Sequence, residues 1–354
     1  MVEFAGYEMP VQYSEGILAE HLHTRAHAGL FDVSHMGQVM VSGEHSEKAL
    51  EAILPVDLEA LPLNHLCYTV FTNPEGGVRD DLIVTRRGND AFMLVVNAAC
   101  KMQDIAYLES QLTGCKVEYC QSDALLALQG PKAQQVLVRH GSDAEAIESL
   151  SFMQGVATRI NGVDCYISRS GYTGEDGFEL SIPNSAVCDV AELLLADDAV
   201  QWIGLGARDS LRLEAGLCLY GHDMNEQTTL PEAGLGWSIS PSRRANGAKA
   251  GGFPGAEIIF AQQQTGVSKK RVGLLVEGRA PVREGSALVN DNGDDIGVVT
   301  SGGFSPTLER PIAMAFIATE YAAAETQVNA LVRGKPRPVK VTSMPFVRHQ
   351  YKRQ

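Results

Sequence analysis

Two adjacent aspartates stand directly before an apolar run, in Gly76-Gly77-Val78-Arg79-Asp80-Asp81-Leu82-Ile83-Val84. Side chains alternate across a strand, so Asp80 and Asp81 point to opposite sides, and one can be solvated while the other enters a low-dielectric cavity. A half-buried carboxylate is a candidate base or hydrogen-bond acceptor. For a bare acid pair, however, the commoner explanation is the start of a strand or the cap of a turn.

Two further segments carry polar groups suited to ligand binding. The run from Gly171 to Glu179 contains three glycines, two aromatic residues and three acids, which suits a tight turn close to a ligand as well as an ordinary hairpin turn. In the helix that opens at Gly206, Arg208 and Arg212 lie four positions apart on one face, and either could clamp a carboxylate. The alternative is an ion-pair ladder of Arg208 and Arg212 with Asp209 and Glu214.

Familiar catalytic motifs are absent from the sequence, which has no Walker A loop, G-x-S-x-G elbow or H-E-x-x-H motif. The run Gly204-Leu205-Gly206 resembles half of a dinucleotide fingerprint, but the third glycine is missing. His21, His23 and His27 cluster without an obvious third metal ligand, so we expect no metal. The seven cysteines are scattered and lack a C-x-x-C spacing, which favours reduced thiols and a cytoplasmic protein.

These residues require strands and helices to position them. Helical spacing predicts helices over 42–54, 101–112, 131–139, 185–195 and 208–217, and short β-rich runs predict strands at 37–41, 82–84 and 92–96. Their alternation up to residue 220 indicates an α+β architecture. A loop is expected over 240–255, and the turn-rich sequence after Lys270 predicts an all-β barrel.

Composition narrows the function classes. With 354 residues and 45% hydrophobic content, the chain is expected to form two or three domains. We expect neither a membrane span nor a secretory signal. The net charge of −14 argues against nucleic-acid binding. Residues 269–354 hold 13 Lys and Arg against 8 Asp and Glu, about +5, so this end could attract an acidic partner or ligand, or simply form an ordinary solvated surface.

Five stretches together resemble the glycine-cleavage T-protein family in their order and spacing. The resemblance continues from residues 4–7 through 301–308 to 344–347 and so covers nearly the whole chain. Family members usually carry a further segment before the position that is Met1 here, so we expect this chain to be truncated or to start late. The stretches are Phe31–Met36, Gly76–Val84, Leu126–Pro131, Gly171–Glu179 and Gly206–Tyr220.

The resemblance implies three domains around a central folate cavity, two of them α+β with ferredoxin-like elements and the third a β-barrel. It implies a first domain of residues 1–33 and 119–230, a second of 34–118 and 231–265, and a barrel of 266–354. It also implies an aminomethyltransferase that moves a one-carbon unit from the aminomethyl-dihydrolipoyl H protein to tetrahydrofolate, releasing ammonia and giving 5,10-methylenetetrahydrofolate.

The resemblance also assigns residues. Asp81 would be the catalytic acid and Asp80 its solvated neighbour. Glu179 would hold the polar edge of the pterin, whose paired N–H groups match two carboxylate oxygens. Arg208 would meet folate's charged or polar groups, and the remaining expected contacts to tetrahydrofolate, the co-substrate, are Tyr172, Tyr351, Met36, Asn97 and Trp237. The basic tail, including Arg333, Lys335, Arg337, Arg348 and Lys352, would face the folate glutamate tail or the lipoylated H protein.

Two other functions stay open. A related folate-dependent demethylase would use the same scaffold, and a non-catalytic folate-binding subunit would keep Glu179 and Arg208 but not need Asp81. The stretch Leu217-Cys218-Leu219-Tyr220-Gly221 lacks the cysteine motif of the tRNA-modifying branch, which speaks against that branch. The missing dinucleotide domain speaks against a fused oxidase.

Overall fold

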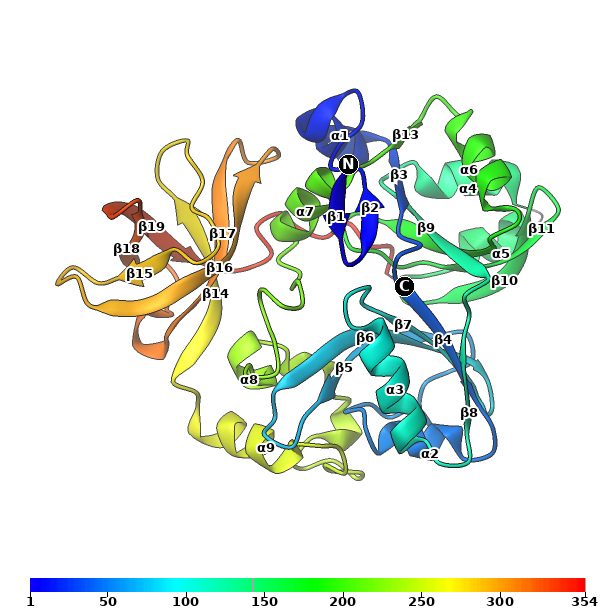
Figure 1. Ribbon diagram of the computed structural model, residues 1–354, viewed down its shortest axis with the longest axis horizontal. Coiled ribbons are helices and arrows are strands. Elements are labelled where there is room, and N and C mark those ends of the chain that lie inside the picture. Colours follow the sequence, from blue (N-terminus) through cyan, green and yellow to red (C-terminus); the bar gives the residue numbers. More distant parts are fainter. Residues whose placement is uncertain (142, 354) are drawn as a thin grey trace.

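The computed structural model describes residues 1–141 and 143–353, which form three lobes (Figure 1). A closed six-stranded barrel occupies the left of that view, a six-stranded sheet the upper right, and a five-stranded sheet the bottom. A small amino-terminal hairpin, β1 (Val2–Phe4) and β2 (Tyr7–Met9), precedes them. The expected α+β class with a carboxy-terminal β-barrel is confirmed.

The six-stranded sheet has the order β10-β11-β12-β9-β3-β13, and all neighbours are antiparallel except β13 and β3. Its strand β12 carries Glu179. Helix α7 lies between this sheet and the barrel, where it packs on β16 and β17. The elements are α1 (Gly16–Ala26), β3 (Ala28–Asp32), β9 (Asp123–Gln129), α4 (Ala133–His140), α5 (Ala144–Ser149), β10 (Gly155–Ile160), β11 (Val163–Ser168), β12 (Gly177–Pro183), α6 (Val187–Leu195), β13 (Val200–Trp202) and α7 (Leu205–Glu214).

The five-stranded sheet is antiparallel in the order β5-β6-β7-β4-β8. Helix α3 packs on it through Ile105 and Leu108, both buried in the core of this lobe. The elements are β4 (Gly37–Ser42), α2 (Ser46–Glu51), β5 (Leu66–Thr72), β6 (Val78–Gly88), β7 (Ala91–Val96), α3 (Lys101–Gln111) and β8 (Lys116–Tyr119), followed later in the chain by α8 (Leu230–Ala233), η1 (Gly236–Ser238), η2 (Pro241–Arg243) and α9 (Ala256–Thr265).

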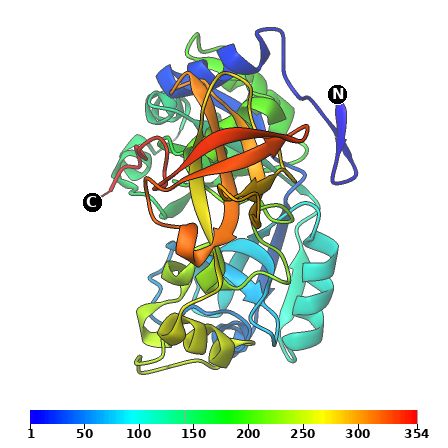
Figure 2. The ribbon, with the colours of Figure 1, turned by 90° about the vertical axis from the view of Figure 1, so that its left-hand side faces the viewer.

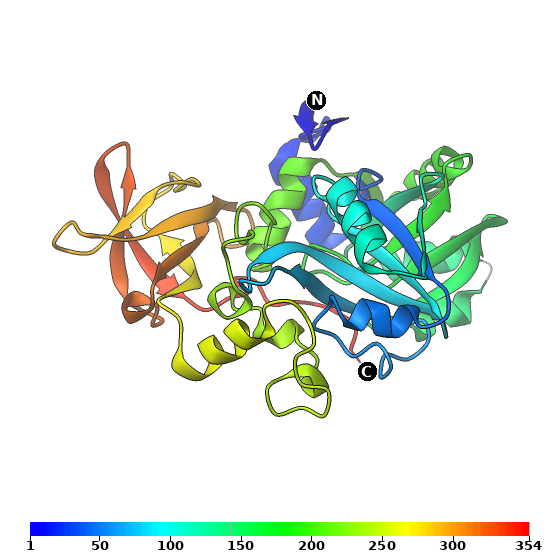
Figure 3. The ribbon, with the colours of Figure 1, turned by 60° about the horizontal axis from the view of Figure 1, so that its bottom comes forward.

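The barrel closes in the order β14-β17-β16-β15-β18-β19 and faces the viewer in Figure 2. Closure pairs every strand on both sides, so the barrel has no free sheet edge. Its elements are β14 (Lys269–Val276), β15 (Ala287–Val289), β16 (Asp295–Ser305), β17 (Arg310–Ala318), η3 (Thr319–Tyr321), β18 (Gln327–Val332) and β19 (Lys335–Thr342). The segment after β19 then runs back from the barrel toward the other two lobes (Figure 3). There the Gln350 N–H donates to the Gly174 carbonyl, in the loop before β12.

The two sheets are interleaved along the sequence. The chain leaves the first sheet after β3, builds the second from β4 to β8, and returns with β9. The domain boundaries at 33/34, 118/119, 230/231 and 265/266 remain our proposal.

Two expected helices differ from those observed. The helix predicted over 42–54 is limited to α2 (Ser46–Glu51), because Ser42 ends β4 and Gly43 turns with a φ of 123°. The helix predicted over 208–217 is α7 (Leu205–Glu214), which stops earlier because Gly216 takes the left-handed conformation common after helix ends. In the described residues, no helix is long and apolar enough to cross a membrane.

Candidate active site

The acid pair lies on β6, the second strand of the five-stranded sheet. Asp80 and Asp81 point to opposite sides of this strand, as expected, but Asp80 is fully buried and Asp81 is half-buried. The expectation that Asp80 is the solvated neighbour is therefore wrong. Helix α3 covers its side of the sheet and brings Asp104 against it, so solvent does not reach this carboxyl.

Asn97 joins the two acids. It follows β7 immediately, and the pairing of Leu82 with Val96 brings it beside the acid pair. The Asn97 Nδ2 group donates to Asp80 Oδ1 at 2.8 Å and to Asp81 Oδ1 at 2.7 Å, while its backbone N–H donates to Asp80 Oδ2 at 3.1 Å. One amide thereby holds both carboxyls in a fixed relation.

The electrostatics of the pair favour proton transfer near neutral pH. Burial, assisted by the charge of Asp80, raises the pKa of Asp81 to about 7, against the hydrogen bonds from Tyr68 and Asn97 that favour the ionised form. A general base is most effective when its pKa lies near the working pH. Asp81 therefore has the setting that a catalytic base or proton shuttle needs.

Two aromatic residues lie beside Asp81. Tyr68 on β5 is the diagonal cross-strand neighbour of Asp81, because Val70 pairs with Asp81, and its hydroxyl lies close enough to the Asp81 carboxyl to lower the pKa of that carboxyl. Trp237 in η1 stacks on Tyr68 with ring centroids 5.2 Å apart and planes at 24°. Trp237 is 61% exposed, so the stacked pair of Tyr68 and Trp237 connects the region of Asp81 with the protein surface.

A second group gathers Glu179, Tyr172 and Arg208. The Arg208 guanidinium lies 4.8 Å from the centre of the Tyr172 ring, within the range of a cation–π contact. The Tyr172 hydroxyl donates to the Cys218 carbonyl, and Glu179 accepts a hydrogen bond from Ser170 Oγ at 2.6 Å. Glu179 also contributes to the electrostatic surroundings of Arg208.

The two arginines of α7 have different roles. Arg212 is buried and pairs with Asp209 at 2.7 Å and Asp223 at 2.8 Å. Arg208 forms no salt bridge with any residue in 1–141 or 143–353, and burial lowers its pKa. The ladder considered for this helix exists only between Asp209 and Arg212, since Glu214 pairs instead with Arg25 and His21. Arg208 is the arginine whose guanidinium is available to a ligand.

The two groups face one interior region, because Asp81 is among the charges that raise the pKa of Tyr172. Tyr351 and Met36 are linked to these groups through neighbours: Met36 packs in one cluster with Ala207 of α7, and Gln350 beside Tyr351 donates to the Gly174 carbonyl. Tyr351 stacks on Phe152 at 3.9 Å, and Met36 packs with the apolar cluster that includes Phe31. Asp81, Asn97, Glu179, Tyr172 and Arg208 are thus brought together more directly than Tyr351 and Met36.

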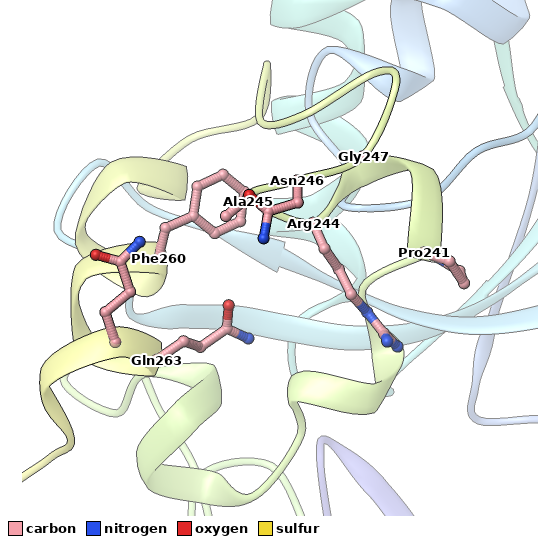
Figure 4. Close-up of a pocket in the computed structure, with 8 residues that line it drawn as sticks. Pro241, Arg244, Ala245, Asn246, Gly247, Phe260 and Gln263 are labelled. Atoms are coloured by element: carbon pink, nitrogen blue, oxygen red, sulfur yellow. The ribbon is translucent and has the colours of Figure 1, made fainter.

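Two cavities of the protein differ in their relation to these groups. One is lined by Arg208 together with Tyr13, Asp32 and Gly204. Figure 4 shows the other, of about 410 Å³, between α9 and the loop after η2. It is lined by Pro241, Arg244, Ala245, Asn246, Gly247, Phe260, Gln263 and Gln264, so it holds none of the residues predicted for the site.

Sequence reasoning did not single out Tyr68 or Asp104. A signal for Asp104 was available, because it falls at helical spacing with Leu108 on the buried face of α3, where an acid is unusual. Tyr68 had no such signal, since its position beside Asp81 depends on the register between β5 and β6. Register follows from packing that a single sequence does not display.

The early histidines are engaged in protein contacts. His21 contacts Ser210 and Glu214, and His23 contacts the carbonyls of Ala28 and Ala199. Within the described ranges, no group of three or more His, Cys, Asp and Glu side chains is arranged to hold a metal ion.

Comparison with known proteins identifies the family. Residues 1–243 match the GCVT N-terminal domain, and residues 269–348 match the glycine cleavage T-protein C-terminal barrel domain. The chain belongs to the glycine cleavage T-protein family. This T-protein family member is 44% identical to a mitochondrial aminomethyltransferase of Dictyostelium discoideum, over 100% of this chain and 90% of that protein. It is 42% identical to the human mitochondrial aminomethyltransferase, over 99% of this chain and 87% of that protein.

A solved structure of the family has the same fold. The crystal structure of the glycine cleavage system aminomethyltransferase T from Bartonella henselae superposes with a TM-score of 0.92 at 43% identity. The match covers 99% of this chain and 95% of that chain, so it includes both sheets and the barrel of this T-protein family member.

Proposed function

We propose that this protein is the aminomethyltransferase of a glycine cleavage system, with Asp81 as its catalytic residue. The observation that carries the proposal is the half-buried Asp81, held by Asn97 and Tyr68, in a chain that matches aminomethyltransferases over its full length. The donor would be the aminomethyl-dihydrolipoyl arm of the H protein, and the acceptor tetrahydrofolate.

The transferred carbon gains two bonds in the reaction and loses two. The carbon of the S–CH₂–NH₂ group becomes bonded to N5 and N10 of tetrahydrofolate, while its bonds to sulfur and to the amino nitrogen break. The two protons lost from N5 and N10 end on the lipoyl thiol and on ammonia, so atoms and charges balance. The protein must orient the two reactants and move protons between nitrogen and the leaving groups.

Asp81 suits that task. A carboxyl with a pKa near 7 can accept a proton from N5 or N10 and deliver it to a leaving group. Its ionised form also stabilises the cationic carbon that develops when sulfur or nitrogen departs. Contributions of this kind are typically about 10²–10⁴-fold, and correct placement of the two reactants supplies much of the remainder.

Glu179 and Arg208 are proposed to bind the folate. The Glu179 carboxylate can accept from the paired N–H groups of the pterin edge, and the unpaired Arg208 guanidinium can donate to a carbonyl or carboxylate. Tyr172 supports the guanidinium through its ring. Trp237, Met36 and Tyr351 are proposed as outer contacts of the ligand.

The partner and the compartment follow as parts of the same proposal. The basic residues after Lys270 would attract the acidic glutamate tail of folate or the surface of the lipoylated H protein. We place the protein in the cytoplasm, which is consistent with its seven free cysteines. The eukaryotic relatives named above are mitochondrial, and the mitochondrial matrix is also reducing.

Two rival functions make different predictions. A folate-dependent demethylase would act on a methylated amine or sulfonium compound and ignore the H protein. A non-catalytic folate-binding subunit would have no use for a carboxyl whose pKa is raised to neutrality. The perturbed acid and its Asn97 support favour an enzyme.

The test is release of ammonia and methylenetetrahydrofolate from aminomethylated H protein, for the wild type and for Asp81→Asn. We expect folate-dependent release by the wild type and a fall in kcat of about 10²–10⁴-fold in the variant. Folate affinity should stay within about threefold, since binding is assigned to other residues. A wild type that is folded and binds folate but releases no ammonia would rule out the proposed function.

A further inference from the structure

Asp104 has an environment that an ionised carboxylate does not tolerate. It lies in the first turn of α3 and is 4% exposed, and its Oδ2 atom is buried without a hydrogen-bond donor among the described residues. Its carboxyl lies against that of Asp80, which is fully buried, close enough for the two groups to share a hydrogen bond. Two carboxylates cannot hydrogen-bond to one another unless one of them carries a proton.

Cations compensate the three acids only weakly within the described residues: the charge of Arg79 lowers the pKa of Asp104 but does not outweigh its burial. None of the salt bridges among residues 1–141 and 143–353 includes Asp80, Asp81 or Asp104. The nearby Arg79 guanidinium lies over the Tyr107 ring at 4.4 Å, and Lys101 donates to the His35 carbonyl at 3.0 Å. A proton is then the remaining means of reducing the negative charge of the cluster.

The contacts continue from Asp104 to the catalytic carboxyl without a gap. Asp104 meets Asp80, both oxygens of Asp80 accept from Asn97, and the Asn97 amide donates to Asp81 at 2.7 Å. We propose that Asp104 is a positioning residue for Asp81. Asp104 donates its proton in a hydrogen bond to Asp80, and Asp80 thereby stays an ionised acceptor that fixes the Asn97 amide.

The direction of the pKa shifts agrees with this arrangement. Burial, with the charge of Asp80 next, raises the pKa of Asp104 to about 9, so Asp104 is neutral at pH 7. Burial also raises the pKa of Asp80, and the hydrogen bonds from Asp104 and Asn97 oppose that rise and favour its ionised form. The other titratable or charged groups that face the cluster are Arg79 on β6, Tyr68 on β5, Cys100 before α3, Tyr172 before β12, and Cys218 and Tyr220 after α7.

The consequence for catalysis rests on the proposed function. An ionised Asp80 raises the pKa of Asp81 by charge repulsion. If Asp80 loses the donor on Asp104, it takes up a proton itself, the repulsion disappears, and the pKa of Asp81 falls. Asp81 then becomes a weaker base and is less well oriented, because a neutral Asp80 holds Asn97 less firmly.

The first test does not depend on turnover. Infrared difference spectra of wild type and Asp104→Asn at pH 8, where Asp81 is mostly ionised and Asp104 is still protonated, should contain the C=O stretch of a buried protonated carboxylic acid, present in the wild type and lost in the variant. This result is expected whether or not the protein transfers aminomethyl groups. A wild type without this band, or a band unaffected by the substitution, would overturn the proposal.

The second test compares two substitutions of one residue. Asp104→Asn keeps a donor toward Asp80, and we expect its kcat within about threefold of wild type with an unchanged acid limb of the pH–rate profile. Asp104→Leu has a similar size but no donor, and we expect kcat to fall about tenfold and the acid limb to move to lower pH, with folate affinity unchanged. Equal losses of kcat in the two variants with an unmoved acid limb would show a packing role only and contradict the proposal.

Should Asp104→Leu fail to fold, Asp104→Asn alone tests the proposal. A fall in its kcat above tenfold contradicts the proposal, and near-normal turnover with loss of the infrared band supports it.

Discussion

Arg208 and Arg212 are single residues on one helix whose surroundings separate binding from stability. Arg212 is buried with two carboxylate partners, whereas Arg208 has an aromatic ring and no carboxylate within ion-pair distance among the described residues. A desolvated, unpaired guanidinium costs stability, and proteins retain such groups where a ligand will pair with them. We therefore assign Arg208 to the proposed ligand site and Arg212 to the stability of the fold.

Substituting each arginine by methionine tests this difference. Arg208→Met should raise the KM for tetrahydrofolate at least tenfold, because a charge-assisted hydrogen bond to the ligand is worth about 1.5–3 kcal/mol. Its melting temperature should be unchanged or higher. Arg212→Met is the matched control, and it should lower stability by about 3–5 kcal/mol, since Asp223 is left buried and unpaired. Equal melting temperatures for the two variants would contradict the assignment.

The raised pKa of Asp81 also has a consequence for stability. A carboxyl whose pKa rises on folding stabilises the folded state below its unfolded pKa, and this contribution is lost as pH rises through the folded value of about 7. Asp81→Asn removes that loss. Its free energy of unfolding relative to wild type should rise between pH 5 and pH 8, by an amount on the order of 1 kcal/mol, and its melting temperature should rise with it. A difference that stays constant with pH would indicate that Asp81 is ionised throughout.

At this scale, alternation along β6 correctly placed the two acids on opposite sides, but it did not reveal which one meets solvent. That depends on α3, which follows about 20 residues later and covers Asp80. The roles of Asp81, Glu179 and Arg208 came from resemblance and remain predictions. Asn97 was a weaker candidate by resemblance, yet it has the most direct contacts with both acids.

Among the elements, the beginning of β6 is the most constrained. The Val78 N–H donates to the carbonyls of Asn225 and Thr228, and a Cβ on Gly77 would lie 1.8 Å from the Glu226 carbonyl oxygen. Only glycine permits this approach of the strand to the segment after α7. The position of the acid pair therefore depends on a backbone contact three residues before it.

Gly77→Ala should push the segment around Glu226 away and disturb Asp80 and Asp81. We expect a loss of stability of about 1–3 kcal/mol and a lower kcat with little change in the KM for folate. Gly88→Ala, at the other end of β6, is the matched control, because its Cβ would meet only the Ala91 Cβ at 3.3 Å. Thermal unfolding and turnover of both variants provide the measurement, and a Gly77→Ala protein indistinguishable from Gly88→Ala would refute the argument.

Most elements could be predicted from local patterns. The strands expected at 37–41, 82–84 and 92–96 lie within β4, β6 and β7, and the helix expected at 101–112 matches α3. Their ends were less predictable, because they depend on turns such as those at Gly43 and Gly216. The pairing order of the strands has no local signature, since β3 pairs with β9 across about 90 residues.

In the whole molecule, one buried carboxylate joins helices α1 and α7 to the barrel. Glu214 ends α7 and accepts hydrogen bonds from His21 Nε2 at 3.1 Å and Arg25 Nη2 at 2.8 Å on α1, and from Ser305 Oγ at 2.5 Å and Thr307 N at 3.0 Å on the barrel side. The barrel itself was foreseen from its turn-rich sequence. This joint was not, because its members are separated by almost 300 residues.

Glu214→Gln should weaken this joint in a pH-dependent way. Hydrogen bonds from His21, Ser305 and Thr307 outweigh burial and lower the pKa of Glu214 to about 2, so its stabilising contribution is present above the unfolded pKa near 4.5 and is lost as pH falls through 2. The variant should be less stable by about 3–5 kcal/mol at pH 7, and the deficit should shrink steadily below pH 4.5.

Glu175→Gln, which removes a second carboxylate partner of Arg25 but has no contact with the barrel among the described residues, is the control. We expect it to have a smaller deficit that does not shrink in the same pH range, because burial raises the pKa of Glu175. A Glu214→Gln deficit that is the same at pH 7 and pH 3 would mean that shape, and not charge, joins the barrel to the rest of the enzyme.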